Sequence, residues 1–262
     1  MAYLLYGIVK DPAASPILDS RLRGDDDFDT YRGRSINENL TGVKGQPVIF
    51  VEACGLCAAV SELDAEVGAP PVAELLAYAR VVEALHRRQA VIPMRYGCFL
   101  NGIKEIQDIL KARRRQYENL LAELAGHIEM GIRILLPEKE CEAISPAGTA
   151  LPEEAPAING RAYLALRKVH YQRQDENNQG RQALIDRFIK AFSGLYARHR
   201  AETDAKKESV ILSLYFLIPE SAVNRFREIF GNMTAKGNDE AMLSGPWPPY
   251  NFVTAEIVKS EE

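Results

Sequence analysis

The stretch Ser244-Gly245-Pro246-Trp247-Pro248-Pro249-Tyr250-Asn251-Phe252-Val253 decides how the end of this chain can fold. It holds three prolines, two further aromatic residues and the only tryptophan of the protein. Because proline fixes φ and lacks an N–H group, this stretch is expected to be extended and to stay out of the middle of a sheet. Its side chains have two roles open to them: anchoring the tail on the protein's own core, or contacting a partner. The residues concerned are Pro246, Trp247, Pro248, Pro249, Tyr250 and Phe252.

The half of the chain that leads to this tail has the pattern of an α+β domain. Val210–Ile218 is the most apolar run, with Ser213 as its only strongly polar residue, and it predicts a central strand covered on both faces. Strands are also expected at Ile132–Leu136 and Phe252–Val258. Helical periodicity marks 163–172, 185–199 and a short helix from Pro219 to Gly231. This order predicts a modified ferredoxin-like domain with helices inserted after its first strand, beyond a proline-rich connector at 137–160.

The first half is also predicted to be α+β, with a topology that the pattern leaves open. Apolar β-rich runs at 3–9 and 48–51 indicate strands, and a polar excursion at 10–46 is expected to be mobile. A helix should begin at Pro70-Pro71 and end near Gln89, and a second helical region should run from Ile103 to Gly126. We therefore expect an N-terminal domain at 1–126, a C-terminal domain at 127–243 and a tail with the last strand at 244–262.

Composition excludes several classes of protein. The chain has 262 residues, with 32 basic and 36 acidic side chains and a formal net charge of −4, which gives no electrostatic footprint for nucleic acid. The N-terminus shows no export signal, and no apolar run approaches the length of a membrane span. We expect a cytoplasmic protein that binds neither nucleic acid nor membrane.

Four cysteines raise the question of thiol chemistry. Cys54-Gly55-Leu56-Cys57 has the C-x-x-C form of a redox site or half of a zinc site, so a cytosolic thiol oxidoreductase is one alternative. The motif continues into the strand-like Ala58-Ala59-Val60 where a redox motif would open a helix, and the sequence has no second C-x-x-C. Buried structural cysteines are the favoured interpretation.

A further candidate site is the Arg95-Tyr96-Gly97 motif. Arg95, Tyr96 and Gly97 could clamp a small anionic ligand, as in a regulatory module, but the favoured role is structural, with Arg95 joining two elements through backbone carbonyls. The acidic cluster at 25–29 lacks the ligand spacing of a calcium loop, and Arg113–Arg115 is best explained as the solvated face of a helix. The four histidines, each on or beside a predicted helix, form no catalytic motif, and no phosphate-binding loop is present. We predict no enzyme activity, no cofactor and no metal.

Five motifs together resemble the gas vesicle protein F/L family. The tail quoted above is similar to the C-terminal signature of that family, and Tyr3–Val9 is similar to its first strand. Three further matches follow the family order: Gly55–Glu62, Val91–Cys98 and Gly160–Leu164. They span nearly the whole chain, and their order together with the tail makes the resemblance specific. The two thiols and the length of the excursion after Val9 depart from the family pattern.

The resemblance implies a function that the residues alone do not show. Family members are accessory and minor structural proteins of gas vesicles that interact with the small shell-forming protein, which is GvpA-like. Before assembly, the apolar surface of that subunit would aggregate in water. The resemblance therefore implies a soluble partner that limits premature association and assists nucleation, together with other accessory proteins. It places this protein in the cytoplasm and on the vesicle, with the gas-facing inner surface as one location.

Overall fold

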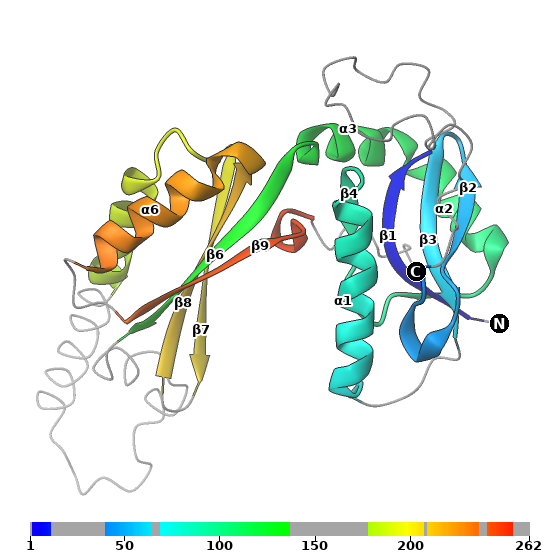
Figure 1. Cartoon of the computed structure of the whole chain (residues 1–262), viewed down its shortest axis with the longest axis horizontal. Helices are drawn as coiled ribbons and strands as arrows, with labels where there is room; N and C mark the ends of the chain where they lie inside the picture. Colours follow the sequence, from blue (N-terminus) through cyan, green and yellow to red (C-terminus); the bar gives the residue numbers. More distant parts are fainter. Residues whose placement is uncertain are drawn as a thin grey trace, which may run out of the picture. The chain divides into compact units, whose positions relative to one another are not determined.

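The computed structural model of the protein describes residues 2–11, 40–63, 69–136, 178–206, 209–235 and 240–253. The chain divides into two compact units, Met1–Ile128 with Trp247–Glu262, and Glu129–Pro246 (Figure 1). Both units combine helices with an antiparallel or mixed sheet, which confirms the predicted α+β class. The tail expected at 244–262 is shared between the units, with the division at Trp247.

The sheet of the first unit is built around β1 (Tyr3–Lys10). Its strand order is β2 (Ile49–Ala53), β3 (Leu56–Glu62), β1, β4 (Val91–Pro93), with the short β5 (Phe99–Leu100) also paired to β1. All of these pairings are antiparallel. Residues 3–9 are all buried, as expected for a strand covered on both faces.

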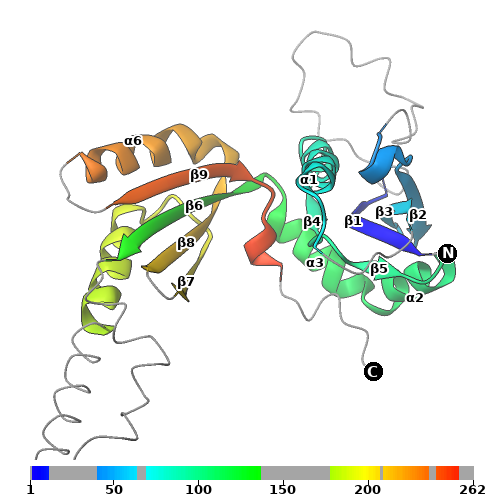
Figure 2. The ribbon, with the colours of Figure 1, turned by 90° about the horizontal axis from the view of Figure 1, so that it is seen from below.

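Helices cover both faces of this sheet. Figure 2 shows α1 (Val72–His86) on one side, and α2 (Ile103–Ala112) and α3 (Arg114–Leu124) on the other. The single helical region predicted after Ile103 is broken at Arg113, whose φ of −110° and ψ of 16° are not helical. The region ends at Gly126, where a φ of +69° favours glycine.

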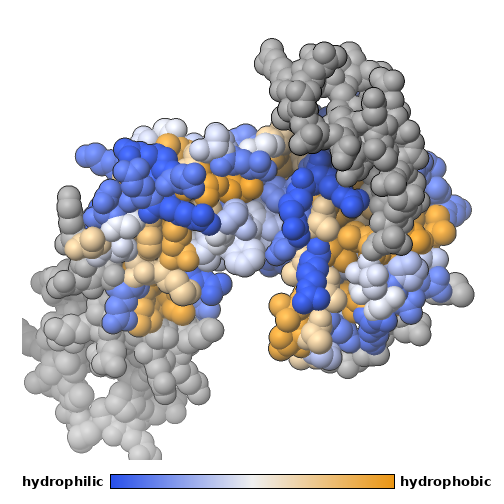
Figure 3. Space-filling view, viewed as in Figure 1, coloured by the Kyte–Doolittle hydropathy of each residue, from blue (hydrophilic) through white to orange (hydrophobic). Residues whose placement is uncertain are grey.

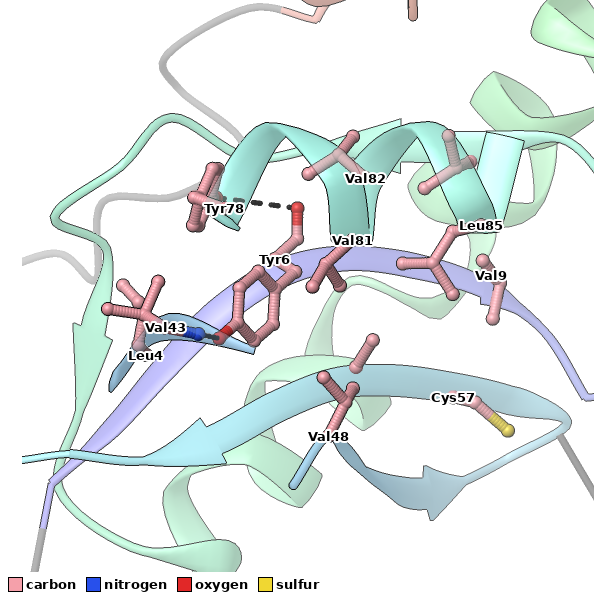
Figure 4. Packing of buried hydrophobic residues seen from close by; sticks show 12 residues of the cluster. Leu4, Tyr6, Val9, Val43, Val48, Cys57, Tyr78, Val81, Val82 and Leu85 are labelled. Atoms are coloured by element: carbon pink, nitrogen blue, oxygen red, sulfur yellow. Dashed lines mark hydrogen bonds between the residues drawn. The ribbon is translucent and has the colours of Figure 1, made fainter. Parts of the chain in front are cut away.

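Tyr6 of β1 and Tyr78 of α1 lie in the core between this helix and the sheet, and each makes hydrogen bonds through its hydroxyl group (Figure 4). The Tyr78 hydroxyl group lies 2.8 Å from Leu5 O and 2.9 Å from Met94 O, so it can donate to either carbonyl. The Tyr6 hydroxyl group accepts a hydrogen bond from Val43 N at 2.9 Å. Val43 is fully buried, so the end of the predicted polar excursion belongs to the core.

The second unit has the strand order of a ferredoxin-like sheet. Its strands are β6 (His127–Leu136), β7 (Arg198–Lys206), β8 (Ser209–Pro219) and β9 (Ala241–Trp247), arranged β7-β8-β6-β9. One helix covers residues 178–191, and α6 (Val223–Thr234) follows β8 after a short turn at Glu220–Ala222. Both helices lie on the same side of the sheet (Figure 1), which fits the predicted modified ferredoxin-like fold.

One strand of this sheet was not predicted. The helix expected to continue through His199 ends at 191, and His199 lies in β7, which pairs antiparallel with β8 along its whole length. Gly194, with a φ of +81°, lies in the turn between this helix and β7. β7 carries alternating charges because it is an edge strand, and edge strands are protected from aggregation by charge.

The last strand was placed wrongly. It was expected at 252–258, but the structure has β9 at Ala241–Trp247, ahead of most of the proline-rich motif. Tyr250–Phe252 forms a single 3-10 turn, and residues 254–262 lie outside the described residues. β9 is an edge strand, so Pro246 can lie in it without breaking a central ladder.

The core of the second unit lies on one face of its sheet. Phe216 of β8 packs against Phe192 and Phe226, and these two rings stack 3.9 Å apart. On the opposite face, Ile211 and Tyr215 remain partly exposed. The prediction that this strand is covered on both faces is therefore wrong at these two positions, whereas the other residues from 210 to 218 are buried.

Several predicted features lie outside the described residues. They are most of the excursion after Val9, the acidic cluster at 25–29, the connector at 137–160, the helix at 163–172 and Cys141.

Candidate functional site

The tail after β9 is held by buried residues of the first unit. Pro248 and Pro249 are buried, and Phe252 is only 3% exposed. Tyr250 packs against the core cluster that contains Tyr78. These four side chains are therefore in the positions that an internal anchor requires.

Trp247 lies at the start of this segment and differs from its neighbours. Its side chain is 46% exposed, although tryptophan is usually largely buried. The preceding Pro246 is exposed as well. The six tail residues thus divide into an outer pair and an anchored group of four.

The Arg95-Tyr96-Gly97 motif follows β4 and is split in a similar way. Arg95 is exposed, and within the described ranges it makes no hydrogen bond or ion pair with another residue. Tyr96 faces inward, donates a hydrogen bond of 2.7 Å to Glu74 Oε2 and packs edge-on against Tyr78. Gly97 has a φ of +95°, which favours glycine. Tyr96 and Gly97 therefore shape the turn, and Arg95 is neither tied to carbonyls of the described residues nor buried.

The C-x-x-C motif forms a β-hairpin turn. Cys54 and Gly55 both have positive φ values, 55° and 78°, and they connect β2 to β3 with Ala53 opposite Leu56. This is the geometry of the tight two-residue turns that connect antiparallel strands. Contrary to the expectation of buried cysteines, Cys54 is exposed, whereas Cys57 is buried.

The environment of Cys57 disfavours its thiolate. Burial, and to a smaller extent the nearby carboxylates of Asp11 and Glu52, raises the pKa of Cys57 to about 12. Burial, and to a smaller extent the nearby carboxylate of Glu105, raises the pKa of Cys98 to about 11. Nucleophilic thiol chemistry requires the thiolate, so neither residue is activated at neutral pH.

Asp11, Glu52 and Cys57 are the one group of possible metal ligands found among the described residues. Their ligand atoms all lie within 4.8 Å of one another, with Cys57 buried and Glu52 exposed. Glu52 and Cys57 are direct cross-strand neighbours in β2 and β3. Exposed acidic groups often lie close together without a metal ion, so the arrangement by itself identifies no metal site.

An apolar stripe on α1 is exposed, although its helical spacing in the sequence predicted the buried face of the helix. Val72, Leu75 and Leu76 are 71%, 40% and 54% exposed, and they share one side of the helix. In Figure 3 the hydrophobic colour gathers over the lower end of α1. The available signal was the continuation of the apolar pattern around more than one face of this helix.

Comparison with known proteins identifies the family. The family model described as "Gas vesicle synthesis protein GvpL/GvpF" matches residues 2–254, almost the whole chain. The chain belongs to the GvpL/GvpF family. This confirms the resemblance found in the sequence motifs.

Two curated relatives support the same assignment. Gas vesicle protein F2 of Halobacterium salinarum is 23% identical to this GvpL/GvpF protein over 228 residues, covering 85% of this chain and 88% of the relative. Gas vesicle protein F1 of the same organism is 23% identical over 224 residues, covering 84% and 87%.

Two crystal structures share the fold of this family member. The gas vesicle protein GvpF from Microcystis aeruginosa superimposes with a TM-score of 0.68 at 15% identity, covering 97% of this chain and 99% of that one. GvpF from Anabaena sp. PCC7120 gives a TM-score of 0.67 at 18% identity, covering 97% and 98%. At these identities the match supports the α+β fold and carries no residue roles. No helix among the described residues is long and apolar enough to span a membrane.

Proposed function

We propose that this GvpL/GvpF protein binds the small hydrophobic shell subunit of the gas vesicle, limits its premature aggregation and assists nucleation of the shell. Family membership supports a role in making gas vesicles. The observation that carries the binding proposal is the exposure of Trp247 at the start of a tail whose next residues are buried. An indole group on a rigid segment loses little entropy when it docks on an apolar surface.

The exposed stripe on α1 gives the proposal a second apolar surface. Val72 and Leu76 are each more than half exposed, and burying such side chains against an apolar partner is favourable. A shell subunit in water presents the kind of surface that these residues would cover. The same surfaces fit a protein that stays on the assembled vesicle, on its gas-facing inner side.

The proposal includes no catalytic step. The thiol pair offers an exposed turn residue and a buried thiol whose pKa is about 12, which is not the pattern of a redox site. Arg95 is exposed and offers no enclosed ligand site. Neither observation favours the oxidoreductase or the ligand-binding module.

A pull-down of purified shell protein by the full chain tests the proposal. Wild type should retain the shell protein, and Trp247→Ala should weaken retention by roughly thirtyfold, as for the loss of a tryptophan hot spot. Ile103→Ala is the matched control, because Ile103 is also 46% exposed. If wild type retains no shell protein, direct binding is wrong; if Trp247→Ala retains as much as wild type, Trp247 does not contact the subunit.

A further inference from the structure

The helix-free face of the second sheet is more apolar than a solvated face should be. In β6 the even-numbered residues from 130 to 136 face the helices and are buried, whereas Arg133 and Leu135 on the other face are exposed. Leu135 is 45% exposed and Met242 of the neighbouring β9 is 58% exposed. A one-sided antiparallel sheet normally places polar residues on its outer face.

Two adjoining hollows lie on this face. The larger, about 570 Å³, is lined by Arg133 and by residues of β7 and β8, including Ser213 and Tyr215. The smaller, about 410 Å³, is lined by Leu135, Met242 and other residues of β6, β8 and β9. Arg133 and Ile211 line both, so the hollows form one continuous surface, which we call the sheet groove.

The sheet groove has an excess of negative charge. Among its lining residues, Glu202, Asp204 and Glu240 carry carboxylates and Arg133 carries the one guanidinium group. Arg200 lies beside the groove and pairs with Glu202 at 2.8 Å. With Arg200 counted, three carboxylates stand against two guanidinium groups, so the rim keeps a net charge of −1. The apolar part of the groove, formed by Leu135, Ile211 and Met242, together with this charge favours an apolar occupant with basic flanks.

The pairing of the strands decides which kind of backbone can lie there. β6 is paired on both sides, by β8 and β9, and β8 is paired by β7 and β6. An added strand could therefore find no backbone partner over the floor, and its own amide groups would lose water without replacement. A helix satisfies its backbone internally and buries a stripe of side chains on a sheet face.

We infer that the sheet groove binds an amphipathic α-helix whose apolar stripe packs on Leu135, Ile211 and Met242 and whose basic flanks face the acidic rim. The inference rests on the proposed function only for the identity of the partner, namely a helix of a vesicle protein.

Binding of defined peptides to the full chain tests the inference. The probe is a fluorescent 18-residue peptide of leucine and lysine with helical periodicity, followed by anisotropy. Comparison peptides carry the same residues in scrambled order, or glutamate in place of lysine. The periodic lysine peptide should bind at least about tenfold more tightly than either. Equal binding of the scrambled peptide would overturn the inference.

Variants locate the site. Leu135→Thr with Met242→Thr removes apolar surface without adding charge and should weaken binding about tenfold. Ile103→Thr in α2, with a side chain of similar exposure, is the matched control and should leave binding unchanged. Equal effects of the two variants would contradict the sheet groove as the site. Hydrogen exchange of wild type gives a second measure, since bound peptide should protect β6 and β8.

The peptide experiment and the pull-down of shell protein can fail independently of each other. If wild type retains no shell protein but binds the peptide in the sheet groove, the inference holds for another helical partner. If shell protein is retained but the peptide is not bound, the inference fails and the proposed function stands. A dimer in sedimentation that the double variant dissociates would show that a second copy occupies the groove, which also overturns the inference.

Discussion

Tyr78 joins α1 to two segments of the first unit through one hydroxyl group. Its oxygen lies within hydrogen-bonding distance of Leu5 O in β1 and Met94 O after β4. The side chain is 4% exposed, so neither carbonyl gains water if the hydroxyl is removed. Such a buried polar contact costs more when it is broken than a surface contact does.

Tyr78→Phe should lower the free energy of unfolding by about 1–3 kcal/mol, because it leaves a buried acceptor without its donor. Urea denaturation followed by circular dichroism measures the change. Tyr96→Phe is the control: its hydroxyl donates to the partly buried Glu74 carboxylate, where water can replace it, so the loss should be smaller. A larger loss for Tyr96→Phe would contradict the role given to Tyr78.

Cys57 makes stability depend on pH at the alkaline end. Burial and two carboxylates raise the pKa of Cys57 from its ordinary value of 9.0 to about 12. The folded state therefore keeps a proton that the unfolded state loses first. The stabilising contribution is fully present below pH 9 and is lost as pH rises from about 9 to about 12.

The difference in unfolding free energy between wild type and Cys57→Ala should thus shift against wild type above pH 9, by up to about 1.4 kcal/mol per pH unit. Urea denaturation at intervals between pH 8 and pH 10.5 measures it. Parallel curves for wild type and Cys57→Ala would refute the assigned cause.

The β2–β3 hairpin shows that a short motif can belong to a turn and not to a reactive site. The C-x-x-C form suggested thiol chemistry, but its first two residues, Cys54 and Gly55, form a turn with positive φ at both positions. Asparagine adopts that conformation more readily than cysteine, and Asn-Gly is a favoured pair in such turns.

Cys54→Asn should therefore raise the free energy of unfolding by roughly 0.5 kcal/mol, and Gly55→Ala should lower it by about 1 kcal/mol. Thermal melts of both variants measure the effect. If Cys54→Asn destabilises the protein, the exposed cysteine has a role beyond the turn.

The sequence pattern predicted α6 correctly as a helix, but it did not predict where the helix begins and ends. The predicted helix began at Pro219 and stopped at Gly231, whereas α6 covers Val223–Thr234 after a turn at Glu220–Ala222. Gly231 is tolerated inside the helix because its cost of about 1 kcal/mol is smaller than what tertiary packing supplies. That packing comes from the fully buried Phe226, which stacks on Phe192.

Gly231→Ala should stabilise the protein by about 0.5–1 kcal/mol, because an added Cβ meets nothing within 4 Å and helix propensity rises. Chemical denaturation measures the gain. Gly194→Ala is the control: its Cβ also meets no atom, but its φ of +81° makes alanine strained, so stability should fall. A gain in stability for both variants would show that only the free space around each glycine matters, and would contradict this explanation.

At the scale of the whole molecule, local pattern predicted what depends on apolar runs. The buried strands β1 and β8, the start of α1 and the ferredoxin-like order all carry strong local signals. β7 lacks an apolar run, because charged residues alternate along this edge strand, so the pattern of apolar residues did not predict it. The tail residues were found as a group, but local sequence does not decide that Phe252 is buried and Trp247 exposed. Tertiary packing decides that division.

Each of the two units has its own hydrophobic core. The first unit is centred on Tyr6 and Tyr78 under α1, and the second on Phe192, Phe216 and Phe226. Each core has its own sheet, so each unit should unfold as a cooperative element. Phe226→Ala should cost about 3–5 kcal/mol and lower hydrogen-exchange protection in β6 and β8, while β1 and β3 keep theirs. Tyr78→Phe should do the reverse. If either variant lowers protection equally in both sheets, the two units unfold as a single cooperative body, and the prediction of independent unfolding is wrong.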